Sequence, residues 1–524
     1  MKDNTNTHTF TRRDFLKTTG TASAASLVIG PGVLWTRSSQ AADGTRTLTI
    51  GRSIGTATFD PILTAANRDI WVLDNMNANL VRVTYDGDGI EPDLAESWDI
   101  SDDGKRYLFK LRDGLKFSDG SSLEPSDVKF SLERVRDDEG SVLSTMFQSI
   151  KEVNTPDEQQ VEIVLSEPSA PLLSTLAMFS ASIVPEAVVK EKGDQFASQP
   201  VGAGAFKLEQ WDQQSNVTLV KNDHYWQSDK VEVDRVVWEY ISNDNTRILN
   251  LQSAQINAAI SIPFNKIKPL SDDDEIDIHV DKSSREDMLI INHKHKPLDD
   301  VRVRKALFHG INREALIEIA LHGYGEVSNS FIPDGGMFYN PDNPTYEFNQ
   351  DKARALLEDA GVEDLELTLM ISTGNQIGNQ VAVMIQAMLK KIGVKINIAK
   401  HESGELWNTL HTGEFDLSMN YWVNDIIDPD QKASFSLYGY NDSRSYFTNY
   451  KSSKMKELIE EGRKITDRKE REKVYDQIQR LAVEDVVYIN LYYRPFVNAS
   501  RDDVDRFYQN PTGRFMLEGT SVQS

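Results

Sequence analysis

The sequence predicts an α/β protein with mixed sheets, built from layers of strands and helices. Short runs of alternating apolar residues indicate strands, and amphipathic runs at helical spacing indicate helices. The two kinds of segment alternate along the chain, and no repeat or low-complexity block interrupts them. The chain has 524 residues, about three to four times the commonest domain size, so we expect several domains or one multi-lobed body.

The strand signal is clearest in three segments. Tyr107, Phe109 and Leu111 alternate with polar residues, which places them on one face of a strand. Segments 161–165 and 365–369 repeat that pattern. We therefore expect strands at these three places.

The helix signal comes with start and stop residues. Pro125 opens one helix, because its fixed φ suits a first turn. Asn349 can cap a second helix, which stops at Gly361. An apolar stripe over 381–392 predicts a third helix, and a strand over 394–398 follows at once.

The charge balance and the absence of cysteine exclude several classes of protein. There are 57 basic and 81 acidic residues, a net charge of −24, which argues against a nucleic-acid binder because such a protein needs clustered cations. Without cysteine there is no disulfide, no thiolate nucleophile, no cysteine-bound metal and no lipidated cysteine anchor.

Residues 1–41 have the three parts of an export signal. Arg12 and Arg13 precede a weakly apolar stretch, 18–34, and a small-residue run follows up to Ala41. The paired arginines resemble the twin-arginine export motif. The alternative, a membrane anchor, is disfavoured because Gly, Pro and Gly at 30–32 break the apolar stretch. We expect an acidic mature chain in the periplasm, with no membrane insertion.

No motif in the chain supports catalysis. There is no G-x-S-x-G elbow, no H-E-x-x-H pair and no phosphate loop, and segment 202–207 has Lys where a dinucleotide loop needs its third glycine. His293 and His295 form the only tight histidine pair; they would share a face on a strand and bind a metal, but beside Lys294 and Lys296 we favour an exposed loop. We expect no cofactor and no metal site, and not an enzyme.

Four segments resemble the family 5 extracellular solute-binding proteins, the oligopeptide-, dipeptide- and nickel-binding receptors of ATP-driven importers. They are 94–120, which reads LAESWDISDDGKRYLFKLRDGLKFSDG; 200–207, which continues to 221–226; 299–315; and 421–430, which reads YWVNDIIDPD. The resemblance runs from about residue 45 to 500, nearly the whole mature chain.

The resemblance implies a two-lobed periplasmic binding protein fold of type II-like topology, with an extra domain inserted in the first lobe and the ligand between the lobes. It implies hinge crossings near 286 and 488, and closure that an inner-membrane permease of the ATP-binding-cassette class recognises. The domains implied are 43–81 with 198–286 and 488–524 for the first lobe, 82–197 for the inserted domain, and 287–487 for the second lobe.

The resemblance also implies the ligand-binding residues. Asp425 matches the aspartate that pairs with the α-ammonium of peptide ligands, which suits an enclosed site because a buried ammonium needs a fixed opposite charge. Trp422 matches a pocket aromatic. Backbone groups of Tyr421 and Val423 would add the ligand as an extra strand. Tyr492 or Tyr493 stands where the family has a cleft tyrosine.

One departure from the family pattern bears on the ligand. Dipeptide receptors place an arginine on the ligand carboxylate from the segment matching 372–376, which reads Ser-Thr-Gly-Asn-Gln here, and oligopeptide receptors have one at the position of Met419. A dipeptide held at both ends is therefore not expected. We expect a monomeric receptor for peptides; the alternatives are an opine, a sugar conjugate or a metal chelate, an exported hydrolase, or a folding helper.

Overall fold

A computed structural model describes residues 44–440 and 447–523, so the predicted export signal lies outside the described residues. None of the helices within these limits is long and apolar enough to span a membrane. The α-helices are α1 Asn67–Met76, α2 Pro125–Asp137, α3 Leu172–Leu176, α4 Glu186–Lys192, α5 Asp244–Gln252, α6 Ile267–Ser271, α7 Val301–Gly310, α8 Arg313–Ala320, α9 Gln350–Asp359, α10 Gln376–Lys390, α11 Ser403–Thr412, α12 Asp430–Ser436, α13 Ser453–Lys464 and α14 Arg468–Glu484.

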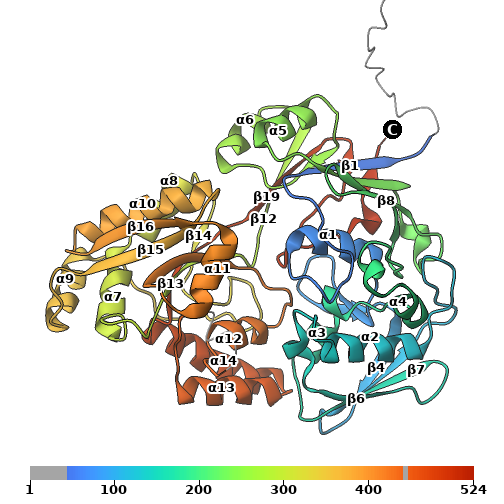
Figure 1. The fold of residues 1–524 in the computed structure, drawn as a ribbon, viewed down its shortest axis with the longest axis horizontal. Helices are drawn as coiled ribbons and strands as arrows, with labels where there is room; N and C mark the ends of the chain where they lie inside the picture. The colour runs from blue at the N-terminus through green and yellow to red at the C-terminus, as the bar shows by residue number, and fades with distance from the viewer. Residues whose placement is uncertain (1–43, 441–446, 524) are drawn as a thin grey trace, which may run out of the picture. The chain divides into compact units, whose positions relative to one another are not determined.

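The first sheet combines strands from both ends of the chain (Figure 1). The central strand β1 runs parallel to its neighbours β10 and β11, and the remaining pairs are antiparallel, so the sheet is mixed. In spatial order its strands are β12 Ile276–Asp281, β19 Phe496–Arg501, β11 Ala258–Ala259, β1 Thr47–Arg52, β10 Arg235–Tyr240, β9 Asn216–Lys221 and β8 Phe206–Asp212.

The second sheet is also mixed and is covered on both faces. Helices α7 to α10 share one apolar cluster with one face, and α11 to α14 share another with the opposite face (Figure 1). Successive side chains of the middle strand β13 point to opposite faces: Leu289 and Ile291 belong to the first cluster, and Met288 and Ile290 belong to the second. In spatial order the strands are β14 Glu326–Val327, β18 Tyr488–Tyr493, β13 Glu286–Ile291, β17 Leu417–Trp422, β15 Glu366–Ser372 and β16 Lys395–His401.

A third sheet lies entirely within 82–197. Its four strands are antiparallel, and α2 packs Val128, Leu132 and Val135 against it in one buried cluster. Its strands in spatial order are β4 Ala95–Ile100, β5 Arg106–Leu111, β7 Gln160–Leu165 and β6 Ile150–Asn154. Two short hairpins pair β2 Val81–Val83 with β3 Ile90–Pro92, and β20 Val504–Asp505 with β21 Ser521–Val522.

The chain passes between the first and second sheets twice. One passage joins β12 to β13 over 281–286, and the other joins β18 to β19 over 493–496. The second passage lies a few residues beyond the expected 488, because β18 still pairs with β13 as far as Tyr493. The two passages are bonded together: the N–H of Arg494 donates to the carbonyl of Arg285 over 3.2 Å.

Most local sequence signals are confirmed. The alternating segments form β5, β7 and β15, and the Asn349 side chain caps α9 by accepting a hydrogen bond from the N–H of Lys352 over 2.9 Å. The glycines of segment 202–207 serve packing: a Cβ on Gly204 would lie 2.5 Å from the carbonyl carbon of Met76. Only glycine allows the end of α1 to approach this segment so closely.

Candidate functional site

Strand β17 carries the predicted site residues and has one edge that is only partly paired. Strand β13 pairs with all six of its residues, from Leu417 to Trp422. On the other edge β15 pairs with Leu417 and Ser418 alone, so 419–422 have no strand partner there within the described part of the chain. The N–H of Tyr421 donates to the side-chain oxygen of Asn420 over 2.9 Å. An extended ligand can add as a strand along this edge.

The two aromatic residues of this strand lie on opposite faces. Trp422 is half-buried, packs 5.5 Å from the ring of Phe435 and donates through Nε1 to the side-chain oxygen of Asn424 over 3.0 Å. Tyr421 has 45% of its surface exposed, and the guanidinium of Arg285 lies 3.7 Å from its ring centre. Strand β17 thus carries an aromatic side chain on each face.

Asp425 follows the strand in a tight turn held by α12. Its N–H donates to Oε1 of Gln431 over 2.8 Å, and its Oδ2 accepts from Nε2 of the same side chain over 2.7 Å. Burial raises the pKa of Asp425 to about 6, against the opposing effects of Gln431 and of the positive Arg514. Asp425 is therefore a half-buried carboxyl group whose ionised form is only partly compensated by its neighbours.

Asp74, which sequence reasoning missed, is the second carboxylate of this site. The guanidinium of Arg514 lies between the two acids: Nη2 donates to the carbonyl oxygen of Asp425 over 2.8 Å, and Nε lies 3.7 Å from Oδ2 of Asp74. Oδ2 of Asp74 is buried and has no hydrogen-bond partner among the described residues. Burial raises the pKa of Asp74. Two acids share one guanidinium, so Arg514 can neutralise only one of them when both are ionised.

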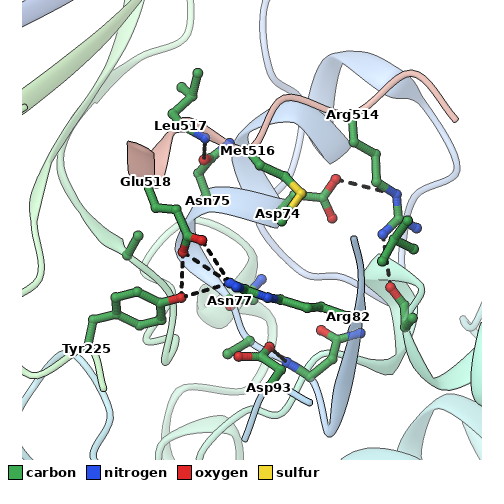
Figure 2. A pocket seen from close by; sticks show the side chains of 15 residues that line it. Asp74, Asn75, Asn77, Arg82, Asp93, Tyr225, Arg514, Met516, Leu517 and Glu518 are labelled. Atoms are coloured by element: carbon green, nitrogen blue, oxygen red, sulfur yellow. Dashed lines mark hydrogen bonds and ion pairs between the residues drawn. The ribbon is translucent and has the colours of Figure 1, made fainter. Parts of the chain in front are cut away.

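A cavity of about 70 Å³ adjoins Asp74 and Arg514 (Figure 2). Asp74 and Arg514 line one part of it, and Arg82 fills another by donating to Glu518 over 2.9 and 3.1 Å. The hydroxyl of Tyr225 donates to the same carboxylate over 2.6 Å. A buried water needs about 10–15 Å³, so the cavity has room for several waters beside Asp74.

Tyr492 and Tyr493 are neighbours in β18 and therefore point to opposite faces of the sheet. Tyr493 donates to the carbonyl of Ser330 over 2.8 Å, and the ammonium of Lys432 lies 5.6 Å from its ring centre. Tyr492 pairs with Asp287, which on its other side pairs with Tyr421. The structure thus brings Tyr492, and not Tyr493, to the face that carries Tyr421.

Asp428 and Asp430 hold the turn at Pro429. Asp428 accepts from the N–H of Asp430 over 2.9 Å and forms a buried pair with Arg471. Asp430 is close to Arg463, whose Nε lies 3.3 Å from its carboxylate. These contacts fix the chain that follows Asp425, which positions the candidate amine partner.

The histidine pair does not form a shared metal face. His293 is half-buried and bonds through Nε2 to the carbonyl of Val487 over 2.8 Å, whereas Nδ1 of His295 lies 3.0 Å from Asp416. Both residues lie in the turn after β13, as expected of a loop, but the expected exposure is wrong for His293 because the turn folds back onto the end of β18. Among the described residues no group of three or more His, Asp or Glu could hold a metal ion.

Comparisons with known proteins agree with this arrangement. Residues 89–444 match the profile described as bacterial extracellular solute-binding proteins, family 5 Middle. The chain is 28% identical over 477 residues to the probable D,D-dipeptide-binding periplasmic protein DdpA of Escherichia coli K12, covering 88% of this chain and 92% of DdpA.

Two solved structures have the same fold. The DppA periplasmic binding protein of Helicobacter pylori, in complex with the peptide STSA, matches with a TM-score of 0.79 and 28% identity over 91% of this chain and 98% of its own. The binding protein AgaA of A. tumefaciens R10, in complex with agropinic acid, matches with a TM-score of 0.80 and 28% identity over 91% and 99%. The expected two-lobed periplasmic binding protein fold with mixed sheets is confirmed.

Proposed function

Because the chain belongs to the family 5 bacterial extracellular solute-binding proteins, we propose that it captures peptides in the periplasm and delivers them to the permease of an ATP-binding-cassette importer. The observation that carries the peptide assignment is the edge of β17 along which β15 pairs with Leu417 and Ser418 alone, with the carboxyl of Asp425 three residues beyond the end of the strand. An added strand supplies affinity through the peptide backbone, and the carboxylate supplies a partner for the α-ammonium.

We propose the division of labour within the site from its contacts. Asp425 pairs with the ammonium, and the charge of Asp74 adds to the attraction across Arg514. Backbone groups of Tyr421 and Val423 hold the peptide main chain. Trp422 bounds the peptide side chains on one face, and Tyr492 belongs to the opposite face; Tyr493 instead supports the interior of the second sheet.

The domain assignment also remains a proposal. The first lobe would comprise 43–81, 198–286 and 488–524, the inserted domain 82–197, and the second lobe 287–487. The bonded passages at 281–286 and 493–496 would form the hinge. The leading 41 residues would be the twin-arginine signal, and the mature receptor would act as a monomer without a lipid anchor.

The test is a thermal-shift screen of the protein after unfolding and refolding to remove bound ligand. Peptides of two to six residues with a free amine are compared with their N-acetylated copies, because acetylation removes the charge that Asp425 would recognise. A ligand at about a hundred times its Kd stabilises by about 2.7 kcal/mol. Stabilisation by free-amine peptides alone supports the proposal, and recovery of the peptide intact after hours excludes turnover. No shift with any peptide contradicts it.

A matched pair of variants assigns the effect to the carboxylate. Asp425→Asn removes the charge at the proposed amine site. Asp281→Asn is the control, because burial also raises the pKa of Asp281 to about 6 but its carboxylate accepts from the N–H of Gln509 at the end of the first sheet. We expect a loss of free-amine binding in the first variant only.

A second candidate ligand class is an opine. The likeness to AgaA in complex with agropinic acid favours it, since that match is as close as the match to the peptide-bound DppA. Agropinic acid in the same screen separates the two candidates: stabilisation by agropinic acid and by no peptide would assign the receptor to opines.

A further inference from the structure

The two passages between the sheets each carry an arginine, and the two guanidinium groups face one carboxylate. Arg285 donates to Asp287 through Nε and Nη2, over 3.0 and 3.3 Å. The Nε of Arg494, on the return passage, lies 4.0 Å from Oδ2 of Asp287. The cluster therefore contains two positive charges and one negative charge.

This charge imbalance lies in partly desolvated surroundings. The side chains are 15% exposed for Arg285, 8% for Asp287 and 22% for Arg494. Asp287 raises the pKa of Arg285 although burial opposes it, whereas burial and the charge of Arg285 lower the pKa of Arg494. An arginine stays protonated under such shifts, so Arg494 keeps a charge that its surroundings do not neutralise.

A buried hydroxyl group adds a second, independent observation. Tyr492 is fully buried in β18 beside Asp287, and its hydroxyl has no hydrogen-bond partner in the described part of the chain. Arg285 and Arg494 are close enough to oppose the effect of burial on the pKa of Tyr492. The phenol O–H of Tyr492 has no acceptor, and the Nε of Arg494 lies 4.0 Å from Oδ2 of Asp287. The cluster therefore has more hydrogen-bond donors than acceptors and lacks one acceptor.

The cluster lies beside β17. Arg285 lies over the ring of Tyr421 at 3.7 Å, and Tyr421 is 45% exposed on the same face of the sheet. A ligand strand added along 419–422 would direct alternate side chains to this face. An anionic group on such a side chain would approach Arg285 and Arg494 from the side of Tyr421.

We propose that Arg494, Arg285 and Tyr492 bind a carboxylate of the ligand, either the terminal carboxylate or an acidic side chain. This inference rests on the proposed function. In this chain segment 372–376 and position 419 carry no arginine that could bind a ligand carboxylate. The arginine cluster would supply that partner. Guanidinium groups suit the task because they present paired N–H donors to both carboxylate oxygens.

The position of the cluster also predicts the length of the ligand. Tyr421 precedes Asp425 by four residues, which span at most about 13 Å of extended chain. An amine at Asp425 and a carboxylate beside Tyr421 are therefore bridged by a peptide of about three or four residues. A dipeptide is too short to reach both groups.

The test is a set of four tetraalanines in which the amine is free or acetylated and the carboxylate is free or amidated. Their Kd values are measured by calorimetry with the wild type, Arg494→Gln and Tyr492→Phe. Charge-assisted hydrogen bonds predict that amidation weakens wild-type binding about 10- to 100-fold, and that Arg494→Gln removes most of this preference. Arg506→Gln is the control, because Arg506 also lies over a tyrosine, Tyr85, but away from β17.

The two ends of the peptide report on different proposals. Loss of binding on acetylation tests Asp425, and loss on amidation tests the arginine cluster. Equal affinity for acid and amide overturns the arginine proposal for the terminal carboxylate; tetraalanine amides with glutamate at the second or third position then test the acidic side chain. If Arg494→Gln changes the Kd of none of these peptides, the arginine proposal is wrong, and the proposed amine site at Asp425 is unaffected.

A simple carboxylate tests the cluster without any peptide. Propionate at tens of millimolar should raise the melting midpoint of the wild type more than that of Arg494→Gln, at constant ionic strength set with chloride. Equal midpoints in the two proteins overturn the arginine site even where no peptide binds.

Discussion

The guanidinium of Arg514 donates a hydrogen bond to the backbone carbonyl of Asp425 over 2.8 Å. The same guanidinium lies between Asp425 and Asp74, two acids that are 351 residues apart in sequence and whose negative charges it cannot both cancel. We therefore expect the site to attract cations before any ligand binds, and we expect the attraction to depend on both acids.

Replacing Asp74 by Asn should weaken the binding of free-amine peptides about three- to tenfold, because a full charge several ångströms from the ammonium is removed from a partly buried site. The pKa of Asp425 should also fall, since Asp74 helps to raise it. Calorimetric Kd values at pH 7, with the exposed Asp223→Asn as control, measure the effect. An unchanged Kd would exclude Asp74 from the amine site.

Peptide binding should weaken as the pH falls through 6. The pKa of Asp425 is raised to about 6 by burial, so about nine-tenths of this carboxyl is ionised at pH 7 and about one-tenth at pH 5. The Kd of a free-amine peptide should rise about tenfold between these values. In the empty protein a raised pKa means that the folded state holds the proton more tightly, so this group's contribution to stability is lost as the pH rises from about 4 to 6.

Titrating a single free-amine peptide by calorimetry between pH 5 and 7.5 gives this profile directly. Asp281→Asn should keep the midpoint near 6, because its own raised pKa is away from the ligand. A flat profile in the wild type would contradict an ionised Asp425 as the amine partner.

Breaking the buried ion pair of the second sheet should cost more stability than removing both partners. Lys432 and Glu286 are about 1% and 0% exposed, and Glu286 also accepts from Ser328 over 2.6 Å and from Asn490 over 2.5 Å. Lys432→Met leaves a buried carboxylate without its cation, which costs about 3–5 kcal/mol. Urea unfolding of Lys432→Met, Glu286→Gln and the double variant should show that the double variant loses much less free energy of unfolding than the sum of the two single losses.

His293 should make the protein less stable in acid. Burial, with the positive charge of Arg304, lowers the pKa of His293 to about 3, so the unfolded chain takes up a proton that the folded chain refuses. The stability that depends on neutral His293 is complete above the unfolded pKa of about 6.5 and is lost as the pH falls toward 3. The free energy of unfolding of His293→Asn should therefore depend less on pH between 6.5 and 4 than that of the wild type, whereas the exposed His224→Asn should keep the wild-type slope.

Backbone recognition at β17 predicts an effect that does not depend on the peptide sequence. Val423→Pro removes an N–H at the proposed ligand edge, and it should weaken all peptides by a similar factor of about 5 to 10, the value of one hydrogen bond. Val423→Ala keeps the N–H and should bind nearly as the wild type. Calorimetry on three tetrapeptides of different composition checks this, and melting midpoints confirm that both variants fold. Selective loss of one peptide would instead indicate a side-chain pocket.

Local signals in the sequence predict local structure well because they report chemistry within a few residues. Asn349 was expected to cap a helix, and it does so through a bond that spans three residues. The alternating strands are found for the same reason, since burial of one sheet face fixes their period. The family resemblance located β17 and Asp425 for a different reason, because it compares whole segments rather than neighbouring residues.

The rest of the site could not be predicted because its contacts join distant segments. Arg514 lies 440 residues from Asp74, and Arg494 lies 209 residues from Arg285, so no local pattern links either pair. The histidine pair shows the same limit: the neighbouring lysines indicated an exposed loop, but the contact of His293 with Val487 decides its burial. Hydrophobic periodicity predicts the helices and strands, whereas the electrostatics of this site arise only when the sheets assemble.

The short pairing between β15 and β17 also has a consequence for the protein without ligand. A strand edge that its neighbour does not pair can join another extended chain, including a second copy of the same strand. The N–H of Tyr421 already donates to the side chain of Asn420, and an incoming backbone would have to displace this bond. Asn420 would thus discourage self-association, and a bound peptide would complete the protection by turning an edge strand into an interior strand.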